Sequence, residues 1–583
     1  MNHSNNLHKF LIFFLVLFSA FLCIYGAKFG LDLTDTGFFL YSQNRLLSEG
    51  MSGESIQHIA IGSDWVGAAW IKYIAGNSLY VAKLGSIFYR FLIVFVTYLT
   101  ISKILKNKTY SAYISIFSLF AFGPVFGFTI INYDLAPLLP AAAIGLLLVN
   151  YKNISTYSFI LIGFLLSIMV LMRTPLLLTA FLFIIFLFFS RKDNMFKNGY
   201  YTIFGFSIPI LCIFFISPLN AAFQPLIQTI SGIIISFFNF SENPVLLVGE
   251  GHNPSGQLMG WIKSYIRVFI AGFFMLLFVY KAPQKSKIFE SKMFSILAVF
   301  FLFFVLSIQL PEWMDIFGMS LESIKNKSIF STIIPAIIFI SSFELIRKLT
   351  LKDNEFLLLF FIIILFITFP VGSNSFGHKF SITFIVILPI LYSIISINIH
   401  NNRLLILRQF LIIFSVATMS SNMVLFYDKP YRDSSVFELK SDINATGLYA
   451  IKTTERRSIA VAEALNWLEF NSSDGDTLLA FGKISMFNFL LQMPGVFDLP
   501  WPSYMSEVEL QDKLDILEEG NNLPKYIIMP LDDVDLPGWP GHLNKSINFK
   551  IRNIHIIQNK IDKFYTASFK SNDFIIYSKE LIK

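Results

Sequence analysis

The chain has 583 residues, of which 55% are hydrophobic and only 14% are charged, and its mean hydropathy is +0.63. No soluble fold needs that much apolar surface, so the composition predicts an α-helical polytopic membrane protein. The net charge of +7 comes from basic clusters in short loops, and this pattern excludes nucleic acid as the expected partner.

Apolar segments close to the roughly 20 residues that cross a bilayer recur along the chain, and we count about thirteen. The first is interpreted as a retained span, because no Ala-x-Ala cleavage site follows it. The expected spans are 10–27, 81–105, 109–128, 132–150, 156–172, 174–190, 200–219, 262–280, 291–310, 329–346, 355–372, 379–399 and 404–427.

Basic residues alternate with these spans. They cluster in every second loop, for example at 103–108, 191–197, 281–292 and 347–352, whereas the opposite loops are neutral or acidic. Because positive charge stays on the cytoplasmic side, the N-terminus is expected in the cytoplasm. The first large loop, 28–80, and the C-terminal tail are then expected outside.

Three stretches outside the spans are long enough to fold. Loop 28–80 indicates two amphipathic helices, over 36–47 and 64–74, that lie along the membrane interface. Loop 218–261 contains a polar segment rich in Gly and Pro and is a candidate mobile lid over a site.

The third stretch is the tail, 428–583, which follows an expected transmembrane module over 1–427. Its charge density is higher and its hydrophobic period changes, so it is expected to form a small extracytoplasmic α/β domain. Its expected elements are a helix over 458–470, strands over 477–481 and 526–529, and a hairpin over 564–577.

Two acidic residues, Asp32 and Asp35, follow the first expected span. Carboxylates so close to the hydrocarbon boundary are costly to desolvate, which suggests a site at the membrane surface. One interpretation is structural, with Asp35 or Thr34 capping a helix that begins near Thr36. The other is a general base that takes a proton from an acceptor hydroxyl.

A second acidic point, Asp134, is expected on the same outer side. Pro137 falls in the first turn of the following span, so Asp134 could simply cap that helix. Function and capping are compatible. Because the two carboxylate sites flank one pair of helices on the same side, they could converge on one cavity.

The candidate cations are Arg173, His378 and Lys379. Arg173 lies between two spans on the side that should be poor in positive charge, where burial costs about 2.5–3.5 kcal/mol, so it needs a partner. It either snorkels to lipid headgroups or binds an anion such as phosphate. His378 and Lys379 end a short outer loop that is either a solvated turn or a phosphate site. Metal-ligand spacing, a P-loop and a dinucleotide fingerprint are missing from the sequence, so a divalent metal has no support and no cofactor is expected.

This arrangement resembles the GT-C superfamily of integral-membrane glycosyltransferases, which includes protein O-mannosyltransferases, lipid A aminoarabinose transferases and oligosaccharyltransferase catalytic subunits. The resemblance rests on acidic residues in the first two outer loops, the many spans and the outer C-terminal domain. Asp32 and Asp35 are separated by two residues, where many members have an adjacent acidic pair. The helix 163–175, which ends in Arg-Thr-Pro, is similar to the family's helix junction with a basic residue.

The resemblance implies transfer of a sugar from a polyprenyl-phosphate donor to a lipid, glycan or protein acceptor at the outer face of the membrane. In an inverting displacement, Asp35 would be the base, while Asp32 or Asp134 would orient the acceptor or stabilise charge at the anomeric centre. The cations Arg173, His378 and Lys379 would bind the leaving phosphate.

Other functions for the same pattern are a transporter or flippase of lipid-linked sugars, an O-antigen polymerase or ligase, and a non-catalytic scaffold. The transporter would place its functional charges at the midplane of the membrane, whereas here they lie at the outer boundary. The composition, rich in Phe, Ile, Asn and Lys, suggests a bacterial inner membrane as the location.

Overall fold

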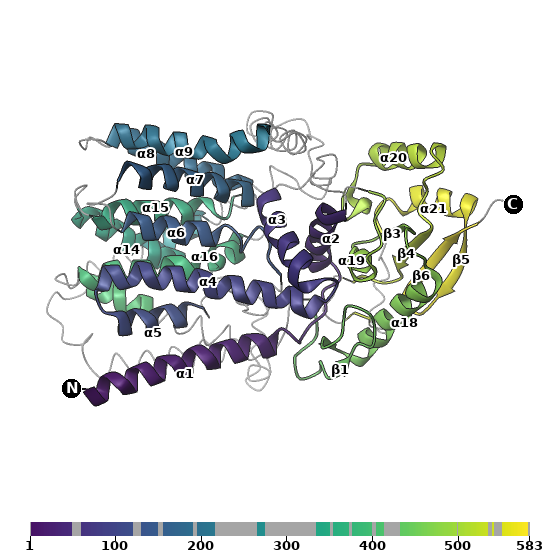
Figure 1. Ribbon diagram of the computed structural model, residues 1–583, viewed down its shortest axis with the longest axis horizontal. Helices are drawn as coiled ribbons and strands as arrows, with labels where there is room; N and C mark the ends of the chain where they lie inside the picture. The colour runs from purple at the N-terminus through teal and green to yellow at the C-terminus, as the bar shows by residue number, and fades with distance from the viewer. Residues whose placement is uncertain are drawn as a thin grey trace.

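The structure is a computed structural model of the chain. It describes residues 2–48, 60–119, 130–149, 155–189, 195–215, 265–273, 334–349, 354–371, 376–398, 404–412, 432–497, 499–534, 539–540 and 551–580. The described part is mostly helical, and Figure 1 shows a layered helical part on one side and an α/β unit on the other.

The helices of the first part run roughly alongside one another, except for α2 and α3, which lie at its border with the α/β unit (Figure 1). They are α1 (Asn2–Gly26), α2 (Asp35–Ser48), α3 (Ile61–Trp70), α4 (Leu79–Leu105), α5 (Lys108–Ser118), α6 (Leu138–Leu148), α7 (Thr156–Met172), α8 (Leu177–Phe189), α9 (Met195–Phe215), α14 (Ile334–Lys348), α15 (Asn354–Thr368) and α16 (Phe376–Ile397). Residues 265–273 and 404–412 are also helical.

Two of the described helices are long and apolar enough to cross a membrane, Asn6–Gly26 and Leu79–Leu105, and several shorter apolar helices accompany them. The expected span 291–310 and the candidate lid 218–261 lie outside the described residues. The span count therefore remains a prediction.

Small residues set the closest helix contact in this part, between α7 and α9. A Cβ atom on Gly163 would lie 1.9 Å from the carbonyl oxygen of Thr202, and one on Gly205 would lie 1.9 Å from that of Ile160. Only glycine allows two backbones to approach so closely. The two glycines therefore fix α7, whose last residue precedes Arg173.

The α/β unit contains a four-stranded sheet in the order β3-β4-β6-β5. Its strands β3 (Leu478–Ala480) and β4 (Tyr526–Pro530) are parallel, whereas β5 (Tyr565–Lys570) and β6 (Phe574–Lys579) form an antiparallel hairpin. Its helices are α18 (Glu455–Asn471), α19 (Met486–Leu491), α20 (Glu507–Glu519) and α21 (Ile554–Phe564). The expected helix, strands and hairpin of the tail are thus confirmed.

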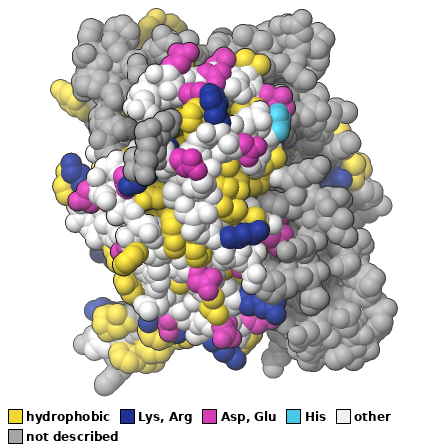
Figure 2. Space-filling view, turned by 90° about the vertical axis from the view of Figure 1, so that its right-hand side faces the viewer, with side chains coloured by type: hydrophobic (Ala, Val, Ile, Leu, Met, Phe, Trp, Pro, Cys, Tyr) yellow, Lys and Arg dark blue, Asp and Glu magenta, His cyan; other side chains and the backbone are white. Residues whose placement is uncertain are grey.

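Alternation along β4 gives the sheet two buried faces. Tyr526 and Ile528 pack into one core with α18 and α19, while Ile527 and Met529 pack into another with α20 and α21. Figure 2 views this unit end-on and shows acidic and basic side chains dispersed between hydrophobic patches. A short pair, β1 (Ser441–Asp442) and β2 (Lys452–Thr453), precedes α18.

The first loop connects the two parts. The expected helices over 36–47 and 64–74 are present as α2 and as α3 with its π-helical extension Ile71–Ala75. Helix α2 packs against α19 of the α/β unit (Figure 1), so closely that a Cβ atom on Gly37 would lie 2.7 Å from the backbone nitrogen of Met486. The loop thereby positions Asp35 between the helical part and the sheet.

Candidate functional site

Asp32 holds the start of α2. Its buried carboxylate accepts hydrogen bonds from the backbone nitrogens of Thr34 at 3.0 Å and Thr36 at 2.8 Å, and from their hydroxyls at 2.7 and 2.9 Å. A carboxylate at this place satisfies the free N–H groups of the first helical turn. The structure thus assigns the capping interaction to Asp32, whereas the sequence suggested Asp35 or Thr34.

Asp35 is the first residue of α2 and the most accessible of the three predicted carboxylates, with 28% of its side chain exposed. Its Oδ2 lies 3.1 Å from Nη2 of Arg432, which also donates a hydrogen bond to the hydroxyl of Thr34. A negative charge in the first turn of a helix is stabilised by the helix dipole. The arrangement joins a carboxylate and a guanidinium at the boundary of the two parts.

Asp134 and Arg173 form a buried ion pair with Oδ1 and Nη1 2.8 Å apart. Nη2 of Arg173 donates to the carbonyl oxygens of Phe369 at 3.1 Å and Val371 at 3.4 Å, so three acceptors neutralise or solvate the guanidinium. The sequence indicated that Arg173 needs a partner, and the structure provides Asp134. The remaining nitrogen, Nε, has no hydrogen-bond partner among the described residues.

Asp134 does not cap α6, which corrects one sequence interpretation. That helix begins at Leu138, with Pro137 in the capping position, because residues 133–137 form turns instead of the expected first helical residues. Oδ1 of Asn132 organises these turns by accepting from the backbone nitrogens of Asp134 at 3.0 Å and Leu135 at 3.1 Å. The Asp134 carboxylate therefore does not cap α6 and instead pairs with Arg173.

Tyr133 connects the ion pair to the helix that carries Asp35. The guanidinium carbon of Arg173 lies 5.2 Å from the centre of the Tyr133 ring, and the Phe39 ring of α2 contacts the same tyrosine at 5.2 Å. Nε2 of Gln43, also on α2, donates to the carbonyl of Ile131 at 2.7 Å. These contacts place the segment around Tyr133 against α2, and the convergence of Asp35 and Asp134 on one cavity stays a prediction.

A second buried ion pair, Asp433 with Arg457, supports the site from the C-terminal side. The two side chains are almost fully buried and 3.0 Å apart. Asp433 also accepts from the backbone nitrogen of Leu31 at 2.8 Å, and Arg457 donates to the carbonyl of Leu31 at 3.0 Å. Burial lowers the pKa of Arg457, and the nearby carboxylates of Asp433 and Asp32 act in the opposite direction.

Sequence reasoning missed this pair, Arg432, and Lys83, whose buried amine donates to the carbonyls of Phe29 at 3.1 Å and Gly30 at 2.6 Å. For Lys83 a signal existed, because a charged residue inside an apolar span marks a functional or structural site. Nothing in the local sequence around Arg432 distinguishes it from the other charges of the tail.

The predicted cations His378 and Lys379 lie in the first turn of α16, where the structure describes the backbone but not these two side chains. Their relation to Asp35 therefore stays a prediction. Over the described ranges, no three His, Cys, Asp or Glu side chains gather as a metal site requires.

No family model and no curated protein matches the chain. Among solved structures, the chain is similar to the archaeal oligosaccharyltransferase AglB from Archaeoglobus fulgidus in complex with an inhibitory peptide and a dolichol-phosphate, with a TM-score of 0.45 and 12% identity over 90% of this chain and 70% of that one. It is also similar to ArnT from Cupriavidus metallidurans in the apo state, with a TM-score of 0.45 and 10% identity over 99% of this chain and 98% of that one. One of these two solved structures is an oligosaccharyltransferase by name, and oligosaccharyltransferase catalytic subunits are among the proteins that the sequence resembles.

Proposed function

We propose that the chain is a GT-C glycosyltransferase of the bacterial inner membrane that moves a sugar from a polyprenyl-phosphate donor to an acceptor at the outer face, with Asp35 as general base. The observation that carries the assignment is the contrast between the three predicted carboxylates. Asp32 accepts from four local donors and Asp134 pairs with the buried Arg173, whereas Asp35 starts a helix with its side chain 28% exposed, and its partner Arg432 is partly exposed as well.

The proposed reaction is an inverting displacement. Asp35 accepts the proton of the acceptor hydroxyl, the hydroxyl oxygen forms the new bond to the anomeric carbon, and the bond from that carbon to the phosphate oxygen breaks. The polyprenyl phosphate leaves as a stable anion, so cations can take the place of a general acid.

Arg432 joins Arg173, His378 and Lys379 as a candidate for binding the donor phosphate. Its guanidinium is partly exposed beside Asp35, and a guanidinium matches the geometry of phosphate oxygens. In this proposal the arriving phosphate takes over part of the Arg432 charge and leaves Asp35 ready to accept a proton.

Asp32 and Asp134 then act as positioning residues. Asp32 orients the first turn of α2 through the Thr34 and Thr36 contacts, and Asp134 orients Arg173. Either substitution would therefore reduce the rate by displacing another side chain and not by removing a reacting group.

The test uses purified protein in lipid nanodiscs with a radiolabelled polyprenyl-phosphate sugar, and it scores cleavage of the donor. We expect Asp35→Asn to abolish cleavage while the protein still inserts and purifies normally. Asp442→Asn, a change of an exposed carboxylate in the surface ion pair with Lys452, is the matched control and should retain activity. A fully active Asp35→Asn protein would rule out the base assignment. Wild-type protein that leaves the donor uncleaved in nanodiscs but moves it between the leaflets of sealed liposomes would indicate a flippase.

The membrane orientation has its own test. We expect Asp474→Cys, in the α/β unit, to react with an impermeant maleimide in intact spheroplasts, and Lys106→Cys, at the end of α4, to react only after lysis. Both positions are exposed, and the natural Cys23 and Cys212 are replaced by serine in both variants. The reverse labelling pattern would invert the proposed topology.

A further inference from the structure

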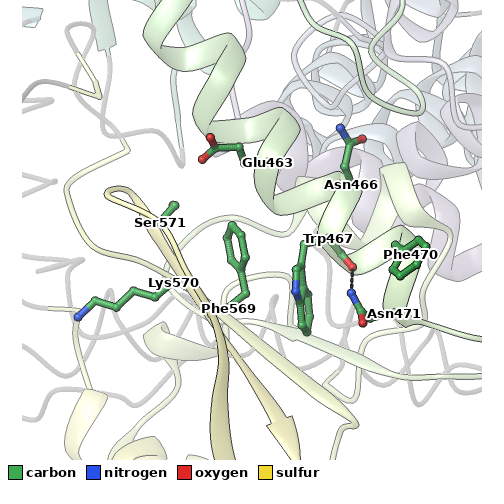
Figure 3. Close-up of a pocket in the computed structure, with 8 residues that line it drawn as sticks. All are labelled: Glu463, Asn466, Trp467, Phe470, Asn471, Phe569, Lys570 and Ser571. Carbon is green, nitrogen blue, oxygen red and sulfur yellow. Dashed lines mark hydrogen bonds between the residues drawn. The ribbon is translucent and has the colours of Figure 1, made fainter.

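The α/β unit carries a shallow groove between α18 and β5, with a volume of about 590 Å³. Figure 3 shows its lining, in which Trp467 of α18 and Phe569 of β5 lie side by side. The two rings are 5.8 Å apart with an angle of 34° between their planes. Strand β5, which forms one side of the groove, is the edge strand that lies far from α2 (Figure 1), so the groove is separate from the candidate catalytic site.

The groove is built on one stripe of α18. Glu463, Trp467 and Phe470 are spaced at i, i+4 and i+7, and therefore share a face of the helix. Phe470 is 88% exposed, which is unusual for a large aromatic residue. Ala464 and Leu468 are buried in the core, and Trp467 is half-buried against that core while it also lines the groove.

A β-bulge directs Phe569 into the groove. Strand alternation from Tyr565, which packs with α20 and α21, would place Phe569 on that same side of the sheet. The register shift between Ala567 and Phe569 adds one residue to β5 and turns Phe569 to the α18 side, where it packs with the other core. Bulges of this kind commonly re-aim a side chain at a functional site.

The aromatic floor is held in place before any ligand binds. Tyr526 contacts the Trp467 ring edge-to-face at 6.1 Å and 87°, and Asn471 donates to the Trp467 carbonyl at 2.7 Å. The dashed line in Figure 3 marks this bond. Because these aromatic side chains are already ordered, a ligand that binds on them loses little affinity to side-chain conformational entropy.

Polar groups with hydrogen-bonding capacity to spare surround the floor. Within the described ranges, the Glu463 carboxylate, the Lys570 amine and the Trp467 indole N–H form no hydrogen bond, and Asn466 makes only a long one of 3.4 Å to the Asn444 carbonyl. The rim offers both donors and acceptors, and one negative charge balances one positive charge.

We propose that this groove binds a neutral saccharide. One face of a pyranose ring presents C–H groups that pack on aromatic faces, and its hydroxyls both donate and accept hydrogen bonds, as the amides, the carboxylate and the indole N–H require. A purely apolar ligand would leave the polar rim unpaired, and a strongly anionic ligand would meet the Glu463 carboxylate. The proposal stands on the groove alone and does not depend on the transfer reaction.

If the chain also transfers sugar, the groove holds a distal part of a glycan acceptor. It would then favour long acceptors over short ones, because only a long glycan reaches from this edge of the sheet toward α2.

The test measures binding without any donor, so its outcome is independent of the transferase proposal. Purified full-length protein is placed in lipid nanodiscs, since glycosidic detergents would compete, and saturation-transfer NMR is recorded with maltoheptaose, cellohexaose and chitohexaose. We expect transfer to the ring protons of at least one of them, and a dissociation constant about tenfold higher for Trp467→Ala, the loss expected for one aromatic stacking contact.

Glu463→Ala is the second variant, because this exposed side chain makes no contact that folding needs, and it should also weaken binding. Tyr449→Ala, which removes an exposed aromatic outside the groove, should bind as the wild type does. Absence of binding to all three oligosaccharides, or equal binding by wild type, Trp467→Ala and Glu463→Ala, would overturn the proposal. Binding of phosphatidylglycerol vesicles that Trp467→Ala abolishes, without saccharide binding, would reassign the groove to lipid.

Discussion

Asp433→Ala should release the segment around Leu31 from the α/β unit. The substitution removes the ion-pair partner that lies 3.0 Å from Arg457, and it deprives the backbone nitrogen of Leu31 of its acceptor. Breaking a buried pair on one side costs about 3–5 kcal/mol because a charge remains buried without compensation. Arg457 keeps the carbonyls of Leu31, Arg432 and Trp539 as acceptors, so the lower end, about 3 kcal/mol, applies.

Hydrogen exchange measured by mass spectrometry reports this release directly. The backbone bonds from Gly30 to the carbonyl of Lys452, at 2.9 Å, and from Lys452 to that of Lys28, at 2.6 Å, cross the junction without involving Asp433. Since about 1.4 kcal/mol changes an equilibrium tenfold, these amides should exchange roughly a hundredfold faster in Asp433→Ala. Peptides from β4 serve as the internal reference and should not change.

The double variant separates the ion pair from general damage. Arg457→Met in the Asp433→Ala background removes the uncompensated charge, so the junction should exchange no faster than in Asp433→Ala alone. The reasoning would be refuted if the junction amides of Asp433→Ala exchanged within threefold of their wild-type rates. It would also be refuted if the effects of the two substitutions on exchange simply added in the double variant.

Three further outcomes are expected. Gly37→Ala should lower transfer activity strongly while leaving membrane insertion intact, because the added methyl group meets the backbone of α19 and displaces α2; turnover and expression levels check this. Asp134→Asn should lower the melting temperature through the uncompensated charge of Arg173, and Asp134→Leu with Arg173→Met should recover much of it in a thermal-shift assay. The Lys560 amine lowers the pKa of the Asp515 carboxyl. The ion pair therefore stabilises the folded protein above the ordinary carboxyl pKa of 3.8, and this stabilisation is lost as the pH falls through the lowered pKa. Melting temperatures measured between pH 2 and 6 should depend less on pH in Lys560→Met than in the wild type.

The sequence predicted the local elements of the α/β unit because hydrophobic alternation and helical spacing are local signals. The strand at Tyr526–Pro530 is fully buried and apolar, and α18 begins directly after Thr454, whose hydroxyl caps it. The cost of burying Arg173 likewise predicted a partner without naming one.

The rest of the site depends on contacts that no local signal encodes. Asp433 bonds to Leu31 across 402 residues, and Arg432 reaches Thr34 across 398. Neighbouring residues do not indicate such partners, since the chain around Arg432 and Asp433 is a short polar stretch like any other. The start of α6 was also wrongly expected at 132, because the turn organised by Asn132 replaces the first helical residues there.

The junction at Leu31 has a consequence for how the protein is made. Its partners Asp433 and Arg457 are synthesised more than four hundred residues after it, so the backbone nitrogen and carbonyl of Leu31 lack these two partners until the tail has left the ribosome. Helix α2 can form early, but it can pack against α19 only after α19 has been synthesised. The surroundings of Asp35, the candidate catalytic aspartate, are therefore complete only after the tail has been synthesised. A product that stops before the tail would lack α19, against which α2 packs.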